Sequence, residues 1–205
     1  MKFKSIAAMV AVIGFWAILA SSAQAQPTSA REFGKTLPPV GYVSYCARSP
    51  EECLPDRAKA TRIDLTEERW AELMMVNTFV NAKIAPVRDE DLYGQAEFWT
   101  MPKDAGDCED ILLMKRRYLH DMGFPLGALR ITVVLDETGE GHAVLTVVSR
   151  KGDYVLDNRR NEIRRWNDTG YRFLKRQSGR NPKVWVSLVE TAPETGGSIQ
   201  VGSGQ

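Results

Sequence analysis

The sequence has few cysteines, few histidines and almost no excess of charge. Its 205 residues include three cysteines and two histidines, and the formal net charge at pH 7 is +1. A chain so close to neutrality offers no electrostatic basis for binding nucleic acid. With two histidines, a catalytic imidazole has only two candidate positions.

Long hydrophobic runs are also absent, apart from one at the N-terminus. Lys2 and Lys4 precede an apolar stretch over 6–19, and Ala23-Gln24-Ala25 has the small-x-small pattern of a cleavage site. We therefore expect residues 1–25 to be a signal peptide and the protein to be periplasmic or secreted. The alternative is a membrane anchor, but the run is shorter than the roughly 20 residues that span a bilayer. No stable membrane insertion is expected after cleavage.

The remainder is long enough for one domain with a core of its own. Removal of 25 residues leaves 180, and the loss of two lysines and no acid takes the formal charge from +1 to −1. We expect one domain over 26–190 and a disordered, Gly/Ser-rich tail over 191–205. No internal repeat is present.

The cysteines divide into a pair and a single residue. An oxidising compartment favours disulfides, and Cys46 and Cys53 flank a turn-rich segment, so they are the natural pair. Closing this loop would stabilise the fold by roughly 2–3 kcal/mol. Cys108 is left over, as either a reactive thiol or a buried inert one.

The order of elements predicts an α+β fold, with helices first and strands after. Thr66 is a candidate N-cap for a helix that ends before Pro86. Other segments are expected to be extended (42–45), a loop (87–103) and strands (129–135, 142–149, 154–157 and 183–189). The basic-leaning stretch over 159–180 is expected to be a solvated surface, with one side of a substrate site as the alternative.

Cys108 is expected to begin a helix over 108–122, with Lys115, Arg116 and Arg117 on its solvated face. A helix N-terminus favours the thiolate, which is the form that attacks carbonyl carbon. The flanking carboxylates of Asp107 and Glu109 act in the opposite sense, and a bound cation is one way to neutralise them.

A cysteine nucleophile needs a base and an orienting group. His120 lies more than three turns along the helix from Cys108 and is expected at the surface. His142 opens a strand and is the remaining base candidate, with Asp157 on the next strand as the orienting group. If Arg150-Lys151 forms the hairpin turn, Asp157 pairs with Val144 and lies roughly 7–8 Å diagonally from His142. A turn at Lys151-Gly152 would place it too far away, and the sequence leaves this register open.

Gln95 lies a short way upstream of Cys108. A side-chain amide there could donate to the oxyanion of an acyl-transfer intermediate. The alternative is an ordinary surface glutamine.

Three ordered motifs resemble those of the bacterial transglutaminase-like cysteine peptidases: Gly106-Asp107-Cys108-Glu109-Asp110, Gly141-His142-Ala143-Val144-Leu145 and Val155-Leu156-Asp157-Asn158. The resemblance covers about residues 36–190. It implies a papain-like, transglutaminase-like fold, with the nucleophile at a helix N-terminus packed on an antiparallel sheet. It also implies a Cys108-His142-Asp157 triad.

The best-known members of this family are calcium-dependent periplasmic proteases that clip the N-terminal region of large biofilm adhesins. The resemblance therefore implies a calcium cofactor held by Asp107 and Glu109, and a protein substrate such as a cell-surface adhesin. Carboxylate oxygens suit a hard cation. The alternative is that both acids only cap the helix.

The sequence thus predicts a secreted or periplasmic cysteine peptidase. Two other functions stay open: transglutaminase-type amide transfer, and a non-catalytic periplasmic binding domain that keeps the fold. Intact candidates at all three triad positions weigh against the second of these.

Overall fold

A computed structural model describes residues 28–55, 58 and 60–190, so the expected signal peptide and C-terminal tail lie outside the described residues. Seven strands form an antiparallel sheet in the order β1-β9-β8-β4-β5-β6-β7. The strands are β1 (Gly34–Thr36), β4 (Leu129–Leu135), β5 (Gly141–Ser149), β6 (Gly152–Asp157), β7 (Arg160–Arg165), β8 (Arg172–Gln177) and β9 (Trp185–Ser187). The expected α+β architecture is confirmed.

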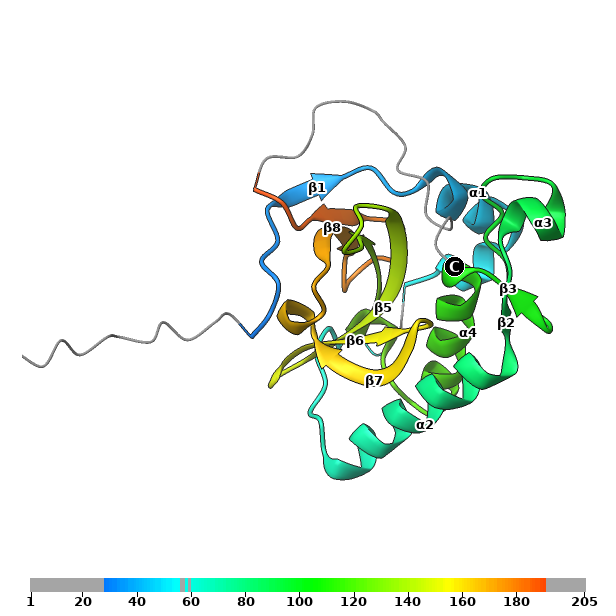
Figure 1. Ribbon diagram of the computed structural model, residues 1–205. Coiled ribbons are helices and arrows are strands. Elements are labelled where there is room, and N and C mark those ends of the chain that lie inside the picture. The colour runs from blue at the N-terminus through cyan, green and yellow to red at the C-terminus, as the bar shows by residue number, and fades with distance from the viewer. Residues whose placement is uncertain (1–27, 56–57, 59, 191–205) are drawn as a thin grey trace, which may run out of the picture.

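The helices gather beside one face of the curved sheet (Figure 1). They are α1 (Val40–Arg48), α2 (Glu67–Lys83), α3 (Asp89–Tyr93) and α4 (Cys108–Asp121), with short 3₁₀ turns η1 (Pro50–Cys53), η2 (Leu126–Ala128) and η3 (Trp166–Asp168). Two short strands, β2 (Ala85–Pro86) and β3 (Ala105–Gly106), pair in parallel on the helical side.

The predicted cysteine helix, α4, lies at the centre of this arrangement. The side chain of Asp107 caps it by accepting a hydrogen bond from the backbone N–H of Asp110. The helix contacts α2, β3, β5 and β6. Its apolar residues join the main core, in which Trp99, Trp185 and Leu73 are fully buried. The position of Cys108 is therefore set by contacts on several sides.

The β5–β6 hairpin has the register that brings the predicted base and orienting group together. Ser149 pairs with Gly152, and Leu145 pairs with Leu156. Continuing this register puts Asp157 opposite Val144, as expected for a turn at Arg150-Lys151. The predicted helix after Thr66 is also present, and the Thr66 hydroxyl accepts from the backbone N–H of Arg69.

Three segments differ from the sequence-based expectation. The segment 42–45 is helical and not extended, because it lies within α1, where Tyr42 and Tyr45 both face the core. The expected loop over 87–103 contains α3. The stretch over 159–180 contains β7 and β8, whose basic side chains form ion pairs instead of a uniformly solvated surface.

The predicted solvated face of α4 is also corrected. Lys115 and Arg116 are buried and only Arg117 is exposed, because α4 is covered by other elements on more than one side. His120, expected at the surface, is half-buried, and its Nδ1 lies 3.0 Å from the carbonyl oxygen of Phe124.

The expected disulfide between Cys46 and Cys53 is present, and Cys108 is free. The disulfide links the C-terminal part of α1 to η1. Within the described part of the chain, every helix is too short or too polar to cross a bilayer.

Candidate active site

Cys108 is the first residue of α4, and its thiol lies against strand β5. The thiol donates a hydrogen bond to Glu109 Oε2 at 2.9 Å, and the sulfur lies near the backbone N–H of Ala143. The residue is 5% exposed. Because Ala143 directly follows His142, the sulfur lies one residue along the strand from the predicted base.

The surroundings of the thiol oppose the helix-terminus effect expected from the sequence. Burial first, and then the negative charges of Glu109 and Asp107, raise the pKa of Cys108 well above its usual value. In this arrangement the sulfur keeps its proton. A thiolate therefore requires a base to take the proton or a counter-charge on the neighbouring acids.

His142 and Asp157 form the predicted base and orienting pair. Nε2 of His142 lies 3.0 Å from Oδ1 of Asp157, and both side chains are 1% exposed. Burial alone would raise the pKa of Asp157, but the hydrogen bond and charge of His142 lower it below the usual range. The carboxylate therefore accepts the Nε2 proton, and in the neutral ring this leaves a free lone pair on Nδ1.

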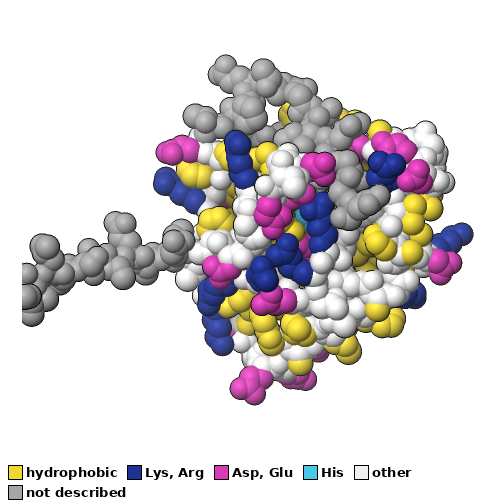
Figure 2. Space-filling model, in the orientation of Figure 1, with side chains coloured by type: hydrophobic (Ala, Val, Ile, Leu, Met, Phe, Trp, Pro, Cys, Tyr) yellow, Lys and Arg dark blue, Asp and Glu magenta, His cyan; other side chains and the backbone are white. Residues whose placement is uncertain are grey.

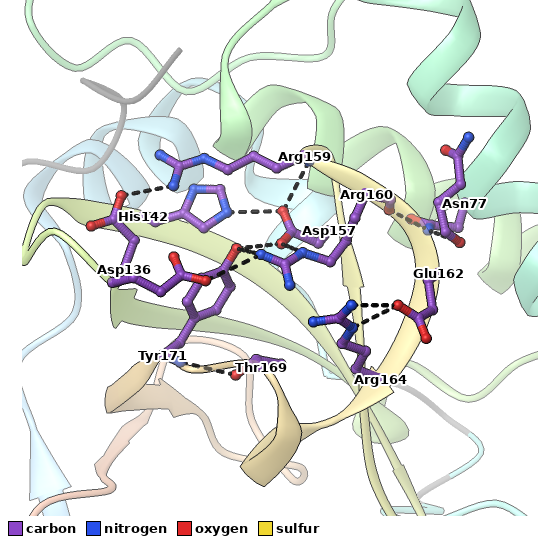
Figure 3. Close-up of polar contacts among 12 residues, drawn as sticks. Asn77, Asp136, His142, Asp157, Arg159, Arg160, Glu162, Arg164, Thr169 and Tyr171 are labelled. Atoms are coloured by element: carbon purple, nitrogen blue, oxygen red, sulfur yellow. Dashed lines mark hydrogen bonds and ion pairs between the residues drawn. The ribbon is translucent and has the colours of Figure 1, made fainter.

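A second charged pair, Arg159 and Asp136, lies in the same region as the imidazole. The side chain of Arg159 runs along the ring of His142 and ends on Asp136, at 2.7 Å (Figure 3). On the molecular face shown in Figure 2, basic and acidic side chains lie next to one another near the centre. Arg160 and Glu137 form another such pair, at 3.4 Å. The surroundings of His142 are therefore a mixture of both charges.

Three buried carboxylates form a cluster, and one of them, Glu109, accepts the hydrogen bond of the thiol. Oxygen atoms of Asp89, Asp107 and Glu109 lie within 4.8 Å of one another. The sequence analysis named Asp107 and Glu109 as candidate calcium ligands, and it did not name Asp89.

The parallel pairing of β2 with β3 explains why Asp89 joins the group. Ala85 pairs with Ala105, and Pro86 with Gly106, so the two chains leave the pair side by side. Asp89 follows three residues after one strand and Asp107 one residue after the other. The only sequence signal was a run of acids at 89–91, which does not single out one of them.

These acids have the character of a hard-cation site. One carboxyl oxygen of each has no hydrogen-bond partner among the described residues: Asp89 Oδ1, Asp107 Oδ2, Glu109 Oε1, and Oδ2 of the adjacent Asp110. Buried oxygens without a donor are costly unless something else satisfies them. All-oxygen donors of this kind suit Ca²⁺ better than a softer metal.

Burial and mutual repulsion raise the pKa values of these acids. Burial, followed by the charge of Asp89, raises the pKa of Asp107 to about 7. Burial, partly offset by the Thr100 backbone N–H, raises the pKa of Asp110 to about 9. Burial and the charge of Asp107 also raise the pKa of Glu109. The protein alone does not supply the positive charge that would hold all of these acids ionised.

Gln95 is not brought to the thiol. It lies in an exposed bend after α3, and no contact between its side chain and Cys108 is found among the described residues. Its assignment as an oxyanion donor stays a prediction.

Comparisons with known proteins give the fold and the family of the chain. A family model described as bacterial transglutaminase-like cysteine proteinase matches residues 32–193. Calcium-bound LapG from Legionella pneumophila is similar in structure, with a TM-score of 0.50 and 24% identity, over 63% of this chain and 74% of that one. At that identity the likeness shows the fold. Comparison with curated protein sequences finds no match.

Two further Legionella pneumophila LapG structures, one of them EGTA-treated, have TM-scores of 0.49 with 23% and 24% identity over 57% of this chain. This chain spans 66% of the length of each of these two. The family model itself extends over most of the sequence and includes the thiol, the imidazole and the carboxylate described above. The chain belongs to the bacterial transglutaminase-like cysteine proteinase family.

Proposed function

We propose that the protein hydrolyses peptide bonds in protein substrates with Cys108 as nucleophile, His142 as general base and Asp157 as the group that orients the imidazole. The observation that supports this most is that the Cys108 sulfur lies near the Ala143 backbone N–H, next to an imidazole whose Nε2 is hydrogen-bonded to a buried carboxylate. No other histidine of the chain fits, because His120 lies near the opposite end of α4.

In the proposed reaction, Nδ1 of His142 takes the proton of Cys108. The thiolate forms a bond to the carbonyl carbon, and the carbonyl electrons move to the oxygen. The backbone N–H of Cys108, at the start of α4, can stabilise this oxyanion. The C–N bond then breaks as His142 gives its proton to the leaving amine. Water, deprotonated by the same ring, adds to the thioester carbon, and the C–S bond breaks as the sulfur takes this proton back and the acid is released.

We propose that Asp89, Asp107 and Glu109 hold calcium. The fit rests on their unpaired, buried oxygens and on their spacing. A bound divalent cation would supply the positive charge that offsets the acids around Cys108.

The calcium site can be tested by titration with Ca²⁺ followed by calorimetry and by thermal unfolding. A ligand that binds only the folded state raises stability by about 2.7 kcal/mol at 100 times its Kd. We expect this rise in wild type and its loss in Asp89→Asn. Asp91→Asn is the matched control, because Asp91 is exposed on the same short helix. An equal rise in both variants would rule out Asp89 as a ligand.

We propose further that the protein acts in the periplasm or outside the cell, on surface adhesins. The disulfide supports an oxidising compartment. The motif resemblance supports adhesins as the substrate class.

The function can be tested by comparing the new protein N-termini on the surface of cells that carry wild-type or variant protein. We expect a cleaved surface protein with wild type and with His120→Ala, and none with Cys108→Ala or His142→Ala. Cleavage that persists in Cys108→Ala would contradict the proposed nucleophile. Loss of cleavage in His120→Ala alone would contradict the proposed base.

A further inference from the structure

The carboxylate of Asp157 accepts hydrogen bonds from other groups besides the imidazole. Oδ1 accepts from His142 Nε2 and from the backbone N–H of Arg159, each at 3.0 Å. Oδ2 accepts from the hydroxyl of Tyr171 at 2.6 Å, and Nε of Arg160 lies 3.3 Å away (Figure 3). The orientation of the carboxylate is therefore set by donors on both oxygens.

The direction of the Tyr171 hydrogen bond follows from its second partner. Nη2 of Arg160 donates to the Tyr171 hydroxyl at 2.9 Å. A guanidinium has no acceptor, so the phenol oxygen must accept there. Its single proton is then available only for Asp157, and the 2.6 Å separation is typical of a hydroxyl donating to a charged carboxylate.

The ring of Tyr171 also contacts the imidazole. The two rings meet edge to face, with centroids 5.6 Å apart and an interplanar angle of 79°. The ring is itself held in an apolar cluster with Val134, Val144 and Phe173. Tyr171 is 9% exposed, so its ring is a buried packing partner of His142 and not a surface group.

From these contacts we propose that Tyr171 is a positioning residue that acts through Asp157. Its hydroxyl holds the carboxylate so that Oδ1 receives the Nε2 proton of His142, which keeps Nδ1 free to take the proton of Cys108. This inference rests on the proposed function. It adds a fourth side chain, from the residue just before β8, to a triad whose members come from α4, β5 and β6.

The first test measures the tautomer of the His142 imidazole and needs no substrate. The chain has two histidines, so long-range ¹H–¹⁵N spectra of untagged, ¹⁵N-histidine-labelled protein contain two ring systems. The Cys108→Ala background is used, because no thiolate can then hold the ring charged. We expect the Nε2–H tautomer of His142 there, and in Tyr171→Phe a shift of both ring nitrogens towards the tautomer average.

Two controls use the same kind of spectrum. His120 should not shift, because it lies far along α4 and bonds to Phe124. Tyr118→Phe removes a phenol hydroxyl from the outer part of α4 and should leave both histidines unchanged. Unchanged His142 signals in Tyr171→Phe, or equal shifts in both histidines, would overturn the proposal.

The second test measures the rate at which iodoacetamide alkylates Cys108, the only free thiol of the chain. We expect Tyr171→Phe to lower this rate about tenfold, since a hydrogen bond to a charged group is lost. In the Asp157→Ala background the same change should alter the rate less than twofold, because Tyr171 acts through that carboxylate.

An equal loss in both backgrounds would mean that Tyr171 acts independently of Asp157, and the proposal would be wrong. The outcome is separable from the proposed function. If Cys108→Ala leaves surface cleavage intact, the peptidase assignment fails whatever the alkylation rates are. If Cys108→Ala is inactive while Tyr171→Phe matches wild type in both tests, only the role of Tyr171 fails.

Discussion

At the scale of single residues, Lys115 shows how far the environment departs from what its type suggests. It is 1% exposed on the central helix, where sequence periodicity placed it in solvent. Burial lowers the pKa of Lys115 to about 7 from 10.5, and the charge of Asp157 offsets only part of that effect. The folded protein therefore releases a proton that the unfolded chain keeps.

This difference in proton binding predicts that Lys115 lowers the free energy of unfolding by an amount that depends on pH. Between about pH 7 and 10.5 the unfolded state binds more protons, so stability rises with pH over that window. We expect Lys115→Met to raise the free energy of unfolding at pH 7 by about 1–3 kcal/mol. The gain should shrink at pH 9.5. Urea unfolding at both pH values measures this, with exposed Lys103→Met as the control. A gain that is the same at both pH values would refute the argument.

At the scale of elements, α1 shows tertiary contacts overriding local preference. The sequence Tyr42-Val43-Ser44-Tyr45 is rich in strand-forming residues, yet it is helical. A helix places Tyr42 and Tyr45 on one face, where Tyr42 packs edge-on against Trp99 and Trp185. The aromatic contacts therefore decide the conformation of the segment.

The close approach of α1 to Trp99 predicts an unusual effect at Gly41. A Cβ there would lie 2.5 Å from Cδ1 of that ring. Gly→Ala in an exposed helix usually stabilises by about 1 kcal/mol. We expect Gly41→Ala to destabilise by about 1–3 kcal/mol instead, because the buried ring has little room to move. Thermal unfolding tests this, with Val43→Ala, on the exposed face of α1, expected to stay within about 0.5 kcal/mol of wild type. A stabilised Gly41→Ala would disprove the close packing.

At the scale of the whole molecule, the N-terminal arm is joined to the sheet by an ion network in which exposed Glu32 meets buried arginines. Glu32 lies 2.6 Å from Arg130 and 2.9 Å from Arg176, residues far along the chain on β4 and β8. Arg176 also pairs with the buried Asp153 at 2.7 Å. The arm additionally pairs through β1 with β9. One glutamate thus links three distant parts of the fold.

We expect Glu32→Gln to destabilise the protein at pH 7 by about 1–2 kcal/mol. This is less than for a fully buried pair, because the Glu32 side chain is 37% exposed. Burial would raise the pKa of Glu32, but Arg176 and Arg130 lower it below 4.5. Its contribution is therefore complete above about pH 4.5 and is lost as the pH falls through the lower, folded-state pKa. Chemical unfolding should show a smaller deficit at pH 3 than at pH 7, and none at either pH for exposed Glu140→Gln.

The sequence by itself determined the features that depend on short-range interactions. Capping and periodicity placed the helices after Thr66 and Asp107, loop length paired Cys46 with Cys53, and the three ordered motifs selected the family. The hairpin between His142 and Asp157 was one of two registers, and strand pairing selected between them.

Only the tertiary structure decided the rest. Asp89 joins Asp107 because two short strands pair in parallel, and Tyr171 reaches Asp157 because β8 returns beside β4. The burial of Lys115 depends on what covers α4. These are contacts between residues distant along the chain, and no local pattern of residue types specifies which distant partner a side chain will meet.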